Sequence, residues 1–438
     1  MLHKLKLIQE KIESLSKTKP IKVVSHFDTD GITSAAIMSR ALHRWKKEFS
    51  LEIVKNLEEE YIASLPDSHI LIFLDLGSGS LNYLGRKKTE VIILDHHEIV
   101  QEIPANVIMT NPHIDKCDMV SSAAICYLFA KGLSPLNQDL AHLAVIGMVG
   151  DTLERNLNKL YDEILKDSGT TVKRGLLIYP STRPLDKALE YSSNPFIQGV
   201  TGSYKGSVEL LMDAKIPKEN GKYKSLHELT DEEMGNLITA ILLRGVNEKA
   251  LQESIGNIFL VKSFNKLEDA RECSALINAC SRMGYPHISL GFSLGNKSLM
   301  EKAEKIYYEY KQHLIAALRY VEESEKITGK NYEIINAKDK IRDTIIGTVA
   351  SIISRSPVYQ EGTVIVALAY NEDKIKVSAR MAGKSGRNVR DVLHQVVARI
   401  GGEVGGHPNA AGCLISKEKE SPFIEELKKV LDIEMIKV

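Results

Sequence analysis

The sequence predicts an α/β protein with two α/β lobes and a largely helical insertion between them. In the first lobe, short apolar runs alternate with helical stretches from residue 21 to about 155, which is typical of a mostly parallel, doubly wound sheet. Three of these runs lead directly into acids or histidines, as strands do at the carboxyl edge of such a sheet. A second alternation of strands and helices begins near residue 332 and predicts a smaller lobe.

The first lobe starts with a helix over residues 4–16, where Leu and Ile recur at helical spacing. Strands are expected at 21–25, 70–74 and 91–94, and helices at 31–49, 119–133 and 137–150. Because parallel strands in a doubly wound sheet end at the same edge, the residues that follow the three strands should lie close together.

The middle of the chain predicts a charged helix near 155–167, a helix that begins at Thr230 with a capping box to Glu233, and an amphipathic helix over 267–283. A long charged helix over 297–328 then leads to the second lobe. The sequence of that lobe predicts helices at 343–354, 388–400 and 421–431, and strands at 363–370, 374–380 and 410–416. We therefore expect three domains: 1–155, 156–330 and 331–438.

Composition limits the classes of protein that the chain can belong to. Lys plus Arg and Asp plus Glu both total 57, so any nucleic-acid binding must come from a local basic groove rather than from bulk charge. Five scattered cysteines predict neither a disulfide framework nor a cysteine zinc site. No apolar stretch reaches the roughly 18 residues that a membrane helix needs, and no secretion signal is expected. A cytoplasmic protein without membrane contact fits these features.

Acids and histidines follow the strands in four clusters. Asp28 and Asp30 come after the first strand, Asp75 after the second, Asp95-His96-His97 after the third, and Asp151 closes the helix over 137–150. Alone, Asp-Thr-Asp-Gly reads equally as a turn or a helix cap, and a histidine pair alone is usually structural. Together, the four clusters favour a metal site.

Such a set suits two metal ions held about 3.5–4 Å apart around one phosphoryl group. This arrangement needs a bridging carboxylate, which an acid on a central strand can provide. A mixture of carboxylate and imidazole ligands favours manganese, with zinc, cobalt and iron as alternatives.

These motifs resemble a known family. The segments His26-Phe27-Asp28-Thr29-Asp30-Gly31, Asp75-Leu76-Gly77, Asp95-His96-His97 and Gly150-Asp151 resemble the four motifs of the DHH phosphoesterase superfamily. The segment Gly405-Gly406-His407, with Asn409, is similar to the glycine-rich motif of the associated DHHA1 substrate-binding domain. Over 20–155 and 340–416, the chain is similar to RecJ-like single-strand exonucleases, in particular the archaeal ones.

The resemblance implies a two-manganese centre in a cleft flanked by the two lobes. Asp28 would bind one ion and Asp30 the other, with Asp75 between them. His96 and Asp151 would complete the second ion's ligands.

Three further residues of these motifs would lie around the two ions. His97 would face the scissile phosphate, and Asp95 would orient an imidazole. His26 has two interpretations, as a ligand or as a structural neighbour of the acids.

The second lobe offers candidates for substrate binding. The amides of Gly405 and Gly406 can face a phosphate, His407 can add a donor, and Arg380 can grip a phosphate with two hydrogen bonds. The alternatives are a glycine turn between helix and strand, and a surface salt bridge for Arg380.

The middle segment offers further candidates for contact with the substrate. Asn278 and Arg282 either reach the cleft or form a polar helix face. Four aromatic residues either stack on a single strand or belong to a satellite core: Tyr179, Tyr191, Phe196 and Tyr204.

The function expected from the resemblance is a manganese-dependent hydrolase: an exonuclease on single-stranded DNA or RNA, of the kind used in DNA repair and RNA processing. A 5′ to 3′ direction follows from the RecJ resemblance only. A phosphodiesterase of short oligonucleotides or cyclic dinucleotides is one alternative. A scaffold subunit of a replication or RNA-processing complex is another, with replication factors or a metallo-β-lactamase-type ribonuclease as partners.

Overall fold

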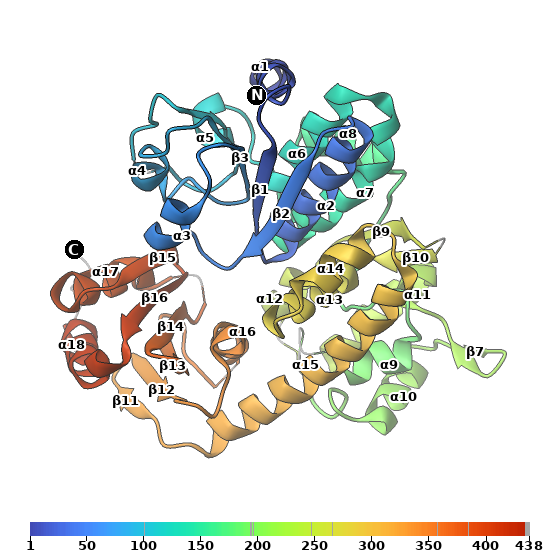
Figure 1. The fold of residues 1–438 in the computed structure, drawn as a ribbon. Coiled ribbons are helices and arrows are strands. Elements are labelled where there is room, and N and C mark those ends of the chain that lie inside the picture. The colour runs from blue at the N-terminus through green and yellow to red at the C-terminus, as the bar shows by residue number, and fades with distance from the viewer. Residues whose placement is uncertain are drawn as a thin grey trace. The chain divides into compact units, whose positions relative to one another are not determined.

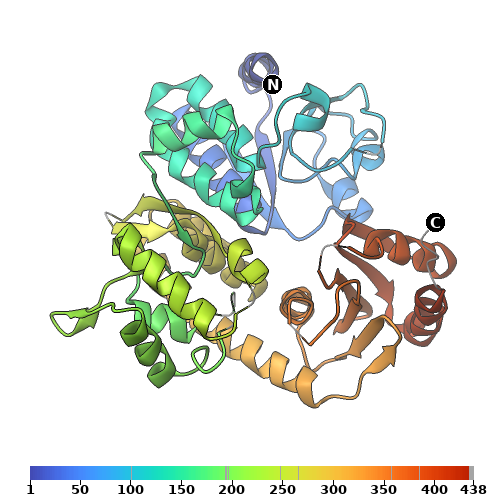
Figure 2. The ribbon, with the colours of Figure 1, turned by 180° about the vertical axis from the view of Figure 1, so that it is seen from behind.

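The computed structural model divides the chain into two compact units, Met1–Tyr307 and Tyr308–Val438 (Figures 1 and 2). The structure describes residues 1–99, 101–192, 195, 197–246, 248–264, 266–356, 358–383 and 385–433. Over those ranges, every helix is too short or too polar to cross a lipid bilayer. The domain limits at 155 and 330 remain predictions, since the two units divide inside a helix at Tyr307.

The described part of the first unit is built on a five-stranded parallel sheet with the order β2-β1-β3-β4-β5. Its strands are β1 (Ile21–His26), β2 (Phe49–Val54), β3 (Ile70–Leu74), β4 (Val91–Leu94) and β5 (Val107–Thr110). In the register, Ser25 pairs with Leu74 and Leu74 with Leu94. The residues that follow β1, β3 and β4 therefore emerge side by side at one edge, as the sequence predicts.

Alternate residues of β3 supply two different cores. Ile70, Ile72 and Leu74 belong to a core on one face, and Leu71 and Phe73 to a core on the other. An apolar run without alternation is what a strand buried on both faces requires. The prediction of a doubly wound sheet is thus confirmed.

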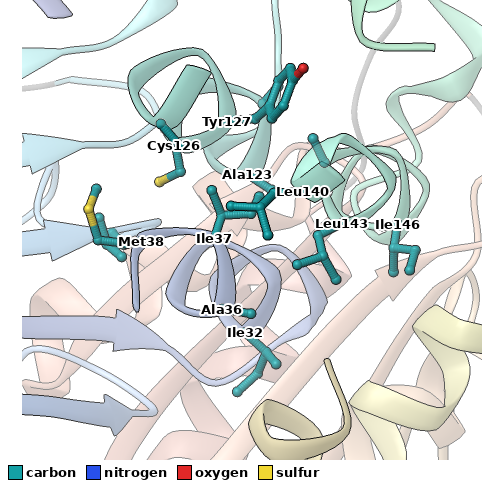
Figure 3. Packing of buried hydrophobic residues seen from close by; sticks show 14 of the residues in the cluster. Ile32, Ala36, Ile37, Met38, Ala123, Cys126, Tyr127, Leu140, Leu143 and Ile146 are labelled. Atoms are coloured by element: carbon teal, nitrogen blue, oxygen red, sulfur yellow. The ribbon is translucent and has the colours of Figure 1, made fainter. Parts of the chain in front are cut away.

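Helices cover both faces of this sheet. The larger core involves α1 (Leu2–Leu15), α2 (Thr29–Arg44), α6 (Ser122–Leu133), α7 (Ala141–Gly150) and α8 (Lys159–Ser168), and the smaller involves α3 (Glu59–Ser64), α4 (Leu81–Leu84) and α5 (Pro112–Asp115). Figure 3 shows side chains of α2, α6 and α7, among them Ile37, Ala123 and Leu143, gathered in the larger core.

The middle of the chain is helical, as predicted, but it also contains a small antiparallel sheet. The helices are α9 (Leu185–Glu190), α10 (Tyr204–Asp213), α11 (Asp231–Leu243), α12 (Glu248–Glu253), α13 (Ala270–Arg282) and α14 (Pro286–Ser293). The small sheet has the order β10-β9-β6 and consists of β6 (Thr171–Leu176), β9 (Ile255–Ser263) and β10 (Lys266–Asp269). The capping box between Thr230 and Glu233 starts α11. A two-stranded hairpin joins β7 (Lys218–Glu219) to β8 (Lys222–Tyr223).

The long helix α15 (Lys297–Glu323) crosses the boundary between the units. The second unit carries a sheet with the order β11-β12-β13-β14-β16-β15 among its described residues. The strands are β11 (Ile327–Gly329), β12 (Tyr332–Asn336), β13 (Val364–Asn371), β14 (Lys374–Met381), β15 (Glu403–His407) and β16 (Ala410–Ser416). Helices α17 (Val389–Ile400) and α18 (Glu420–Asp432) lie on one side of this sheet and α16 (Asp343–Ile353) on the other (Figures 1 and 2).

Two of the predicted segments that differ from the structure lie at sheet edges. The helix expected over 31–49 ends at Arg44, and the chain re-enters the sheet at Phe49 as β2. The glycine-rich stretch forms β15 rather than a turn between helix and strand, because its backbone pairs with β16. Both are edge strands, where a continuous apolar run is not needed.

Candidate metal centre

The carboxyl edge of the first sheet bends sharply at Asp75. Its amide still donates to Leu94 O at 3.0 Å, so the strand ladder reaches this residue. Its φ is +60°, a left-handed conformation that Asp adopts more readily than most residues. The bend turns a side chain that is 1% exposed into the space beside β1 and β4.

Asp75 lies at the centre of the predicted residues. Its Oδ2 is 3.3 Å from His26 Nδ1, while its Oδ1 is 3.5 Å from His96 Nε2. Three groups of possible ligands, each with its ligand atoms within 4.8 Å of one another, all include Asp75: His26, Asp28 and Asp75; Asp30, Asp75, His96 and Asp151; and Asp75, His96 and His97. The two oxygens of one carboxylate thus face two different groups.

The first group forms where β1 passes into α2. Asp28 caps α2, with Oδ1 accepting from Gly31 N at 3.0 Å, and its Oδ2 lies 3.1 Å from His26 Nδ1. A Cβ at Gly31 would come within 2.3 Å of His26 O. The glycine therefore lets α2 begin directly against the strand, which places His26, Asp28 and Asp75 together.

The second group forms between α2, α6 and α7. Asp151 is the C-cap of α7, and its Oδ2 lies 2.9 Å from His96 Nε2. Asp30 is buried, and its oxygens accept from Ser122 N at 2.6 Å and Ala123 N at 3.0 Å, the first amides of α6. Each carboxylate oxygen has two lone pairs, so Asp30 can also bind a cation.

His97 is oriented by Asp95. Asp95 Oδ1 lies 2.7 Å from His97 Nδ1, and Oδ2 accepts from the amide and hydroxyl of Ser78 at 3.1 and 2.6 Å. Asp95 is buried and belongs to none of the groups of possible metal ligands among the described residues, so its place is beside the imidazole. The engaged Nδ1 leaves Nε2 of the half-exposed His97 to contact a ligand.

Burial and the charges of neighbouring carboxylates raise the pKa values of two of these acids. Burial, and next the charge of Asp151, raises the pKa of Asp30 to about 7. Burial, and next the charges of Asp28 and Asp30, raises the pKa of Asp75 to about 6. Burial opposes the charged form of His97 as well, but Asp95 raises its pKa to about 9. Converging carboxylates that disfavour ionisation are the arrangement that a divalent cation relieves.

The donor set fits divalent metal ions. Carboxylate oxygens and imidazole nitrogens are good ligands for manganese and other borderline metals. Asp28 and His26 could hold one ion, while Asp30, His96 and Asp151 could hold a second, with Asp75 between them.

Sequence reasoning missed Ser122 and Gly147. The Ser122 hydroxyl donates to Asp75 Oδ1 at 3.0 Å, in addition to its amide bond to Asp30. A Cβ at Gly147 would lie 2.5 Å from Asp30 Oδ1, so α7 packs onto this acid through a glycine. The paired serines near the start of the predicted helix 119–133 mark a helix start, but nothing in their spacing points to Asp75.

Helix α13, which carries two of the candidates, contacts the start of α2 through Ser274. The Thr29 hydroxyl is 3.1 Å from both the carbonyl and hydroxyl oxygens of Ser274. Asn278 and Arg282 follow at steps of four residues, so they lie on the same side of α13 as Ser274.

The remaining substrate-binding candidates belong to the second unit. Arg380 pairs with Ala410, and Ala410 with His407, so the three residues lie in a row on one sheet face. Arg380 donates from Nε to Ser351 Oγ of α16 at 2.8 Å, which identifies that face as the α16 side. Gly405 lies on the same side two residues from His407. One small side chain, that of Ala410, therefore separates Arg380 from His407 on this face.

The aromatic candidates that the structure describes lie at the surface rather than in a satellite core. Tyr191 is 71% exposed and Tyr204 46% exposed, and Lys187 lies over the Tyr204 ring at 4.6 Å. Lys187 also pairs with Glu190 at 3.0 Å, which offsets its charge. Phe196 lies outside the described residues.

Three protein-family profiles match parts of the chain. The profile described as the DHH family, N-terminal domain, matches residues 20–148, and the DHHA1 domain profile matches 329–432. The chain belongs to the DHH superfamily. A third profile, the DHH-CID domain, matches 178–259 of this DHH protein. With its RecJ-like fold and its acids and histidines gathered in one place, the DHH protein is a metal-dependent phosphoesterase.

Two relatives of this DHH protein have similar sequences. An uncharacterized protein of Methanocaldococcus jannaschii is 27% identical, over 97% of this chain and 96% of its own. The putative SPbeta prophage-derived single-strand DNA-specific exonuclease YorK of Bacillus subtilis is 24% identical, over 59% of this chain and 49% of YorK. The match to YorK thus spans about half of that protein.

Two solved structures share the fold of this DHH protein. RecJ of Thermus thermophilus in complex with Mn²⁺ has a TM-score of 0.61 and 17% identity, over 99% of this chain and 55% of RecJ. CDC45 of Entamoeba histolytica has a TM-score of 0.67 and 13% identity, over 99% of both chains. At these identities, the likeness establishes the fold.

Proposed function

We propose that the protein is an exonuclease that hydrolyses terminal phosphodiester bonds of single-stranded DNA or RNA, using two divalent cations, with Mn²⁺ as the expected metal. The observation that supports two cations is the position of Asp75, whose two oxygens face two separate groups of ligands. A two-cation site supplies an activated water and stabilises charge on the leaving oxygen.

The residues around the cations have separate tasks in this proposal. His26 and Asp28 hold one side of the site, and Asp30, His96 and Asp151 hold the other. His97, which Asp95 keeps in one orientation, directs Nε2 toward the scissile phosphate. In such a reaction, the fixed imidazole donates a hydrogen bond as charge develops on the phosphoryl oxygens.

The second unit is proposed to bind the nucleic-acid end. Arg380 and His407 share one sheet face, with Ala410 between them, and Gly405 beside them leaves the backbone accessible. Arg380 supplies a charged, planar donor for a phosphate. Asn278 and Arg282 on α13 are proposed to contact the strand near the metal-binding loop.

The names of relatives support this choice of substrate. YorK is described as a putative single-strand DNA-specific exonuclease, and RecJ is described as an exonuclease bound to manganese. We carry this activity, and the 5′ to 3′ direction, over as proposals. Replication factors or a metallo-β-lactamase-type ribonuclease as partners also remain proposals.

End-labelled single strands of DNA and RNA, incubated with Mn²⁺, test the proposal. We expect mononucleotide release from one end, and loss of that release in Asp75→Asn. Asp162→Asn, which changes an exposed acid in α8, should retain wild-type activity. Cleavage of dinucleotides without cleavage of long strands would contradict the exonuclease proposal, as would full activity of Asp75→Asn.

A further inference from the structure

Ser122 contacts both carboxylates that lie between the two ligand groups. It is the first residue of α6 and is buried. Its amide donates to Asp30 Oδ2 at 2.6 Å, and its hydroxyl donates to Asp75 Oδ1 at 3.0 Å. One residue therefore ties an acid after β1 to an acid after β3.

Contacts outside the metal centre hold Ser122 in place. Ser121 caps α6 by accepting from Ala124 N, and its own amide donates to the hydroxyl of Tyr161 at 2.7 Å. Tyr161 is fully buried on α8. The first turn of α6 is thus fixed from the side away from the acids, and Ser122 can act as a rigid support for them.

The hydroxyl bond determines which oxygen of Asp75 faces which ligand group. It holds Oδ1 on the side of His96 Nε2, at 3.5 Å, and leaves Oδ2 toward His26 Nδ1, at 3.3 Å. The terminal torsion of an Asp side chain is broad, so a carboxylate without such a bond rotates readily. A rotated carboxylate would face one group of ligands and lose its contact with the other.

We propose that Ser122 is a positioning residue that holds Asp75 in its bridging orientation and thereby couples the two cation sites. This inference rests on the proposed two-cation function. The hydroxyl group alone provides this coupling, because the hydrogen bond from the Ser122 amide to Asp30 remains after any substitution that preserves the backbone. Partners of metal ligands typically contribute 10–100-fold to metal affinity.

Calorimetric titration with Mn²⁺ of the full chain tests the proposal. The wild type should bind two ions, whereas Ser122→Ala should bind one of them roughly 10–100-fold more weakly. Ser122→Thr retains a hydroxyl and should restore both. Ser289→Ala removes another buried serine hydroxyl, one that donates to Ile277 O at 3.2 Å, and should bind as the wild type does.

Further measurements separate the possible outcomes. Unfolding of the metal-free proteins checks that each variant is folded, and Ser122→Gly, which also lacks the hydroxyl, provides a second comparison if the alanine variant unfolds. Two ions bound with wild-type affinity by Ser122→Ala would overturn the role of Ser122 and leave the proposed function intact. A wild type that binds no divalent cation would overturn both.

Discussion

Gly147→Ala would place a methyl group where α7 packs on Asp30. The added Cβ would lie 2.5 Å from Asp30 Oδ1, 2.6 Å from Ala123 Cβ and 2.8 Å from Thr33 Oγ1. Since unstrained contacts need about 3.5 Å, α7 or Asp30 must move by roughly 1 Å. Asp30 cannot move freely, because both of its oxygens accept amide bonds from α6.

Two effects set the size of the change. Overpacking costs about 1–3 kcal/mol of unfolding free energy. The higher helix propensity of alanine returns about 1 kcal/mol. We therefore expect a loss of stability between zero and about 2 kcal/mol. A displacement of 1 Å at a reacting site costs about 100-fold in rate, so activity should fall far more than stability.

Urea unfolding of the metal-free protein, Mn²⁺ titration and the exonuclease assay measure these effects. Gly235→Ala is the matched control, because Gly235 also lies inside a helix and its added Cβ meets nothing within 4 Å. That variant should be more stable by up to about 1 kcal/mol and fully active. Wild-type metal affinity and activity in Gly147→Ala would refute the packing argument.

Three other predictions concern metal binding, backbone strain and pH. Mn²⁺ at 100 times its dissociation constant should stabilise the wild type by about 2.7 kcal/mol, which is measured as a rise in melting temperature. The melting temperature of Asp75→Asn should hardly change, and equal shifts in the two proteins would contradict the site. Thr152 has a φ of +58°, a strained conformation for a β-branched residue. Thr152→Gly should therefore raise the unfolding free energy of the metal-free protein by up to about 1 kcal/mol, measured by urea unfolding. A clear loss of stability would show that no strain is stored there. Arg44 binds both oxygens of Asp139, at 2.7 and 2.6 Å, and lowers the pKa of that carboxyl. Its stabilisation is present above the unfolded pKa of about 3.9 and is lost as pH falls through the lower folded pKa. Asp139→Asn should therefore have a lower unfolding free energy than the wild type at pH 6, and the difference should shrink as the pH falls. A difference that stays constant with pH would contradict this role of the Arg44–Asp139 pair.

The central strands of the first sheet could be predicted because burial on both faces demands apolar runs. Those runs are visible in the sequence at 70–74 and 91–94. The edge strand β2 alternates half-buried and exposed residues along most of its length, so it has no such run and the sequence does not predict it; only its first residue, Phe49, falls within the helix expected over 31–49. The small sheet of the middle segment was missed as well, because the exposed first half of β6 conceals its pattern.

The metal centre was predictable where ligands follow strands, since parallel strands end at a shared edge. Asp28, Asp75 and His96 lie within the groups that the structure brings together. Ser122 and Gly147 were not predictable, because their contacts depend on how closely α6 approaches Asp75 after β3 and how closely α7 approaches Asp30 on α2. Sequence spacing carries no information about that approach.

The contact between Thr29 and Ser274 has a consequence for how the chain tolerates change. It joins the start of α2 to α13, 245 residues further along the chain. Between these two points, the residues from 176 to 251 form most of a separate core within the first unit, like a detour anchored at both ends. Their length and sequence can vary while the anchors stay in place, but a protein truncated before α13 would keep every metal ligand and lose the support beside Asp28 and Asp30.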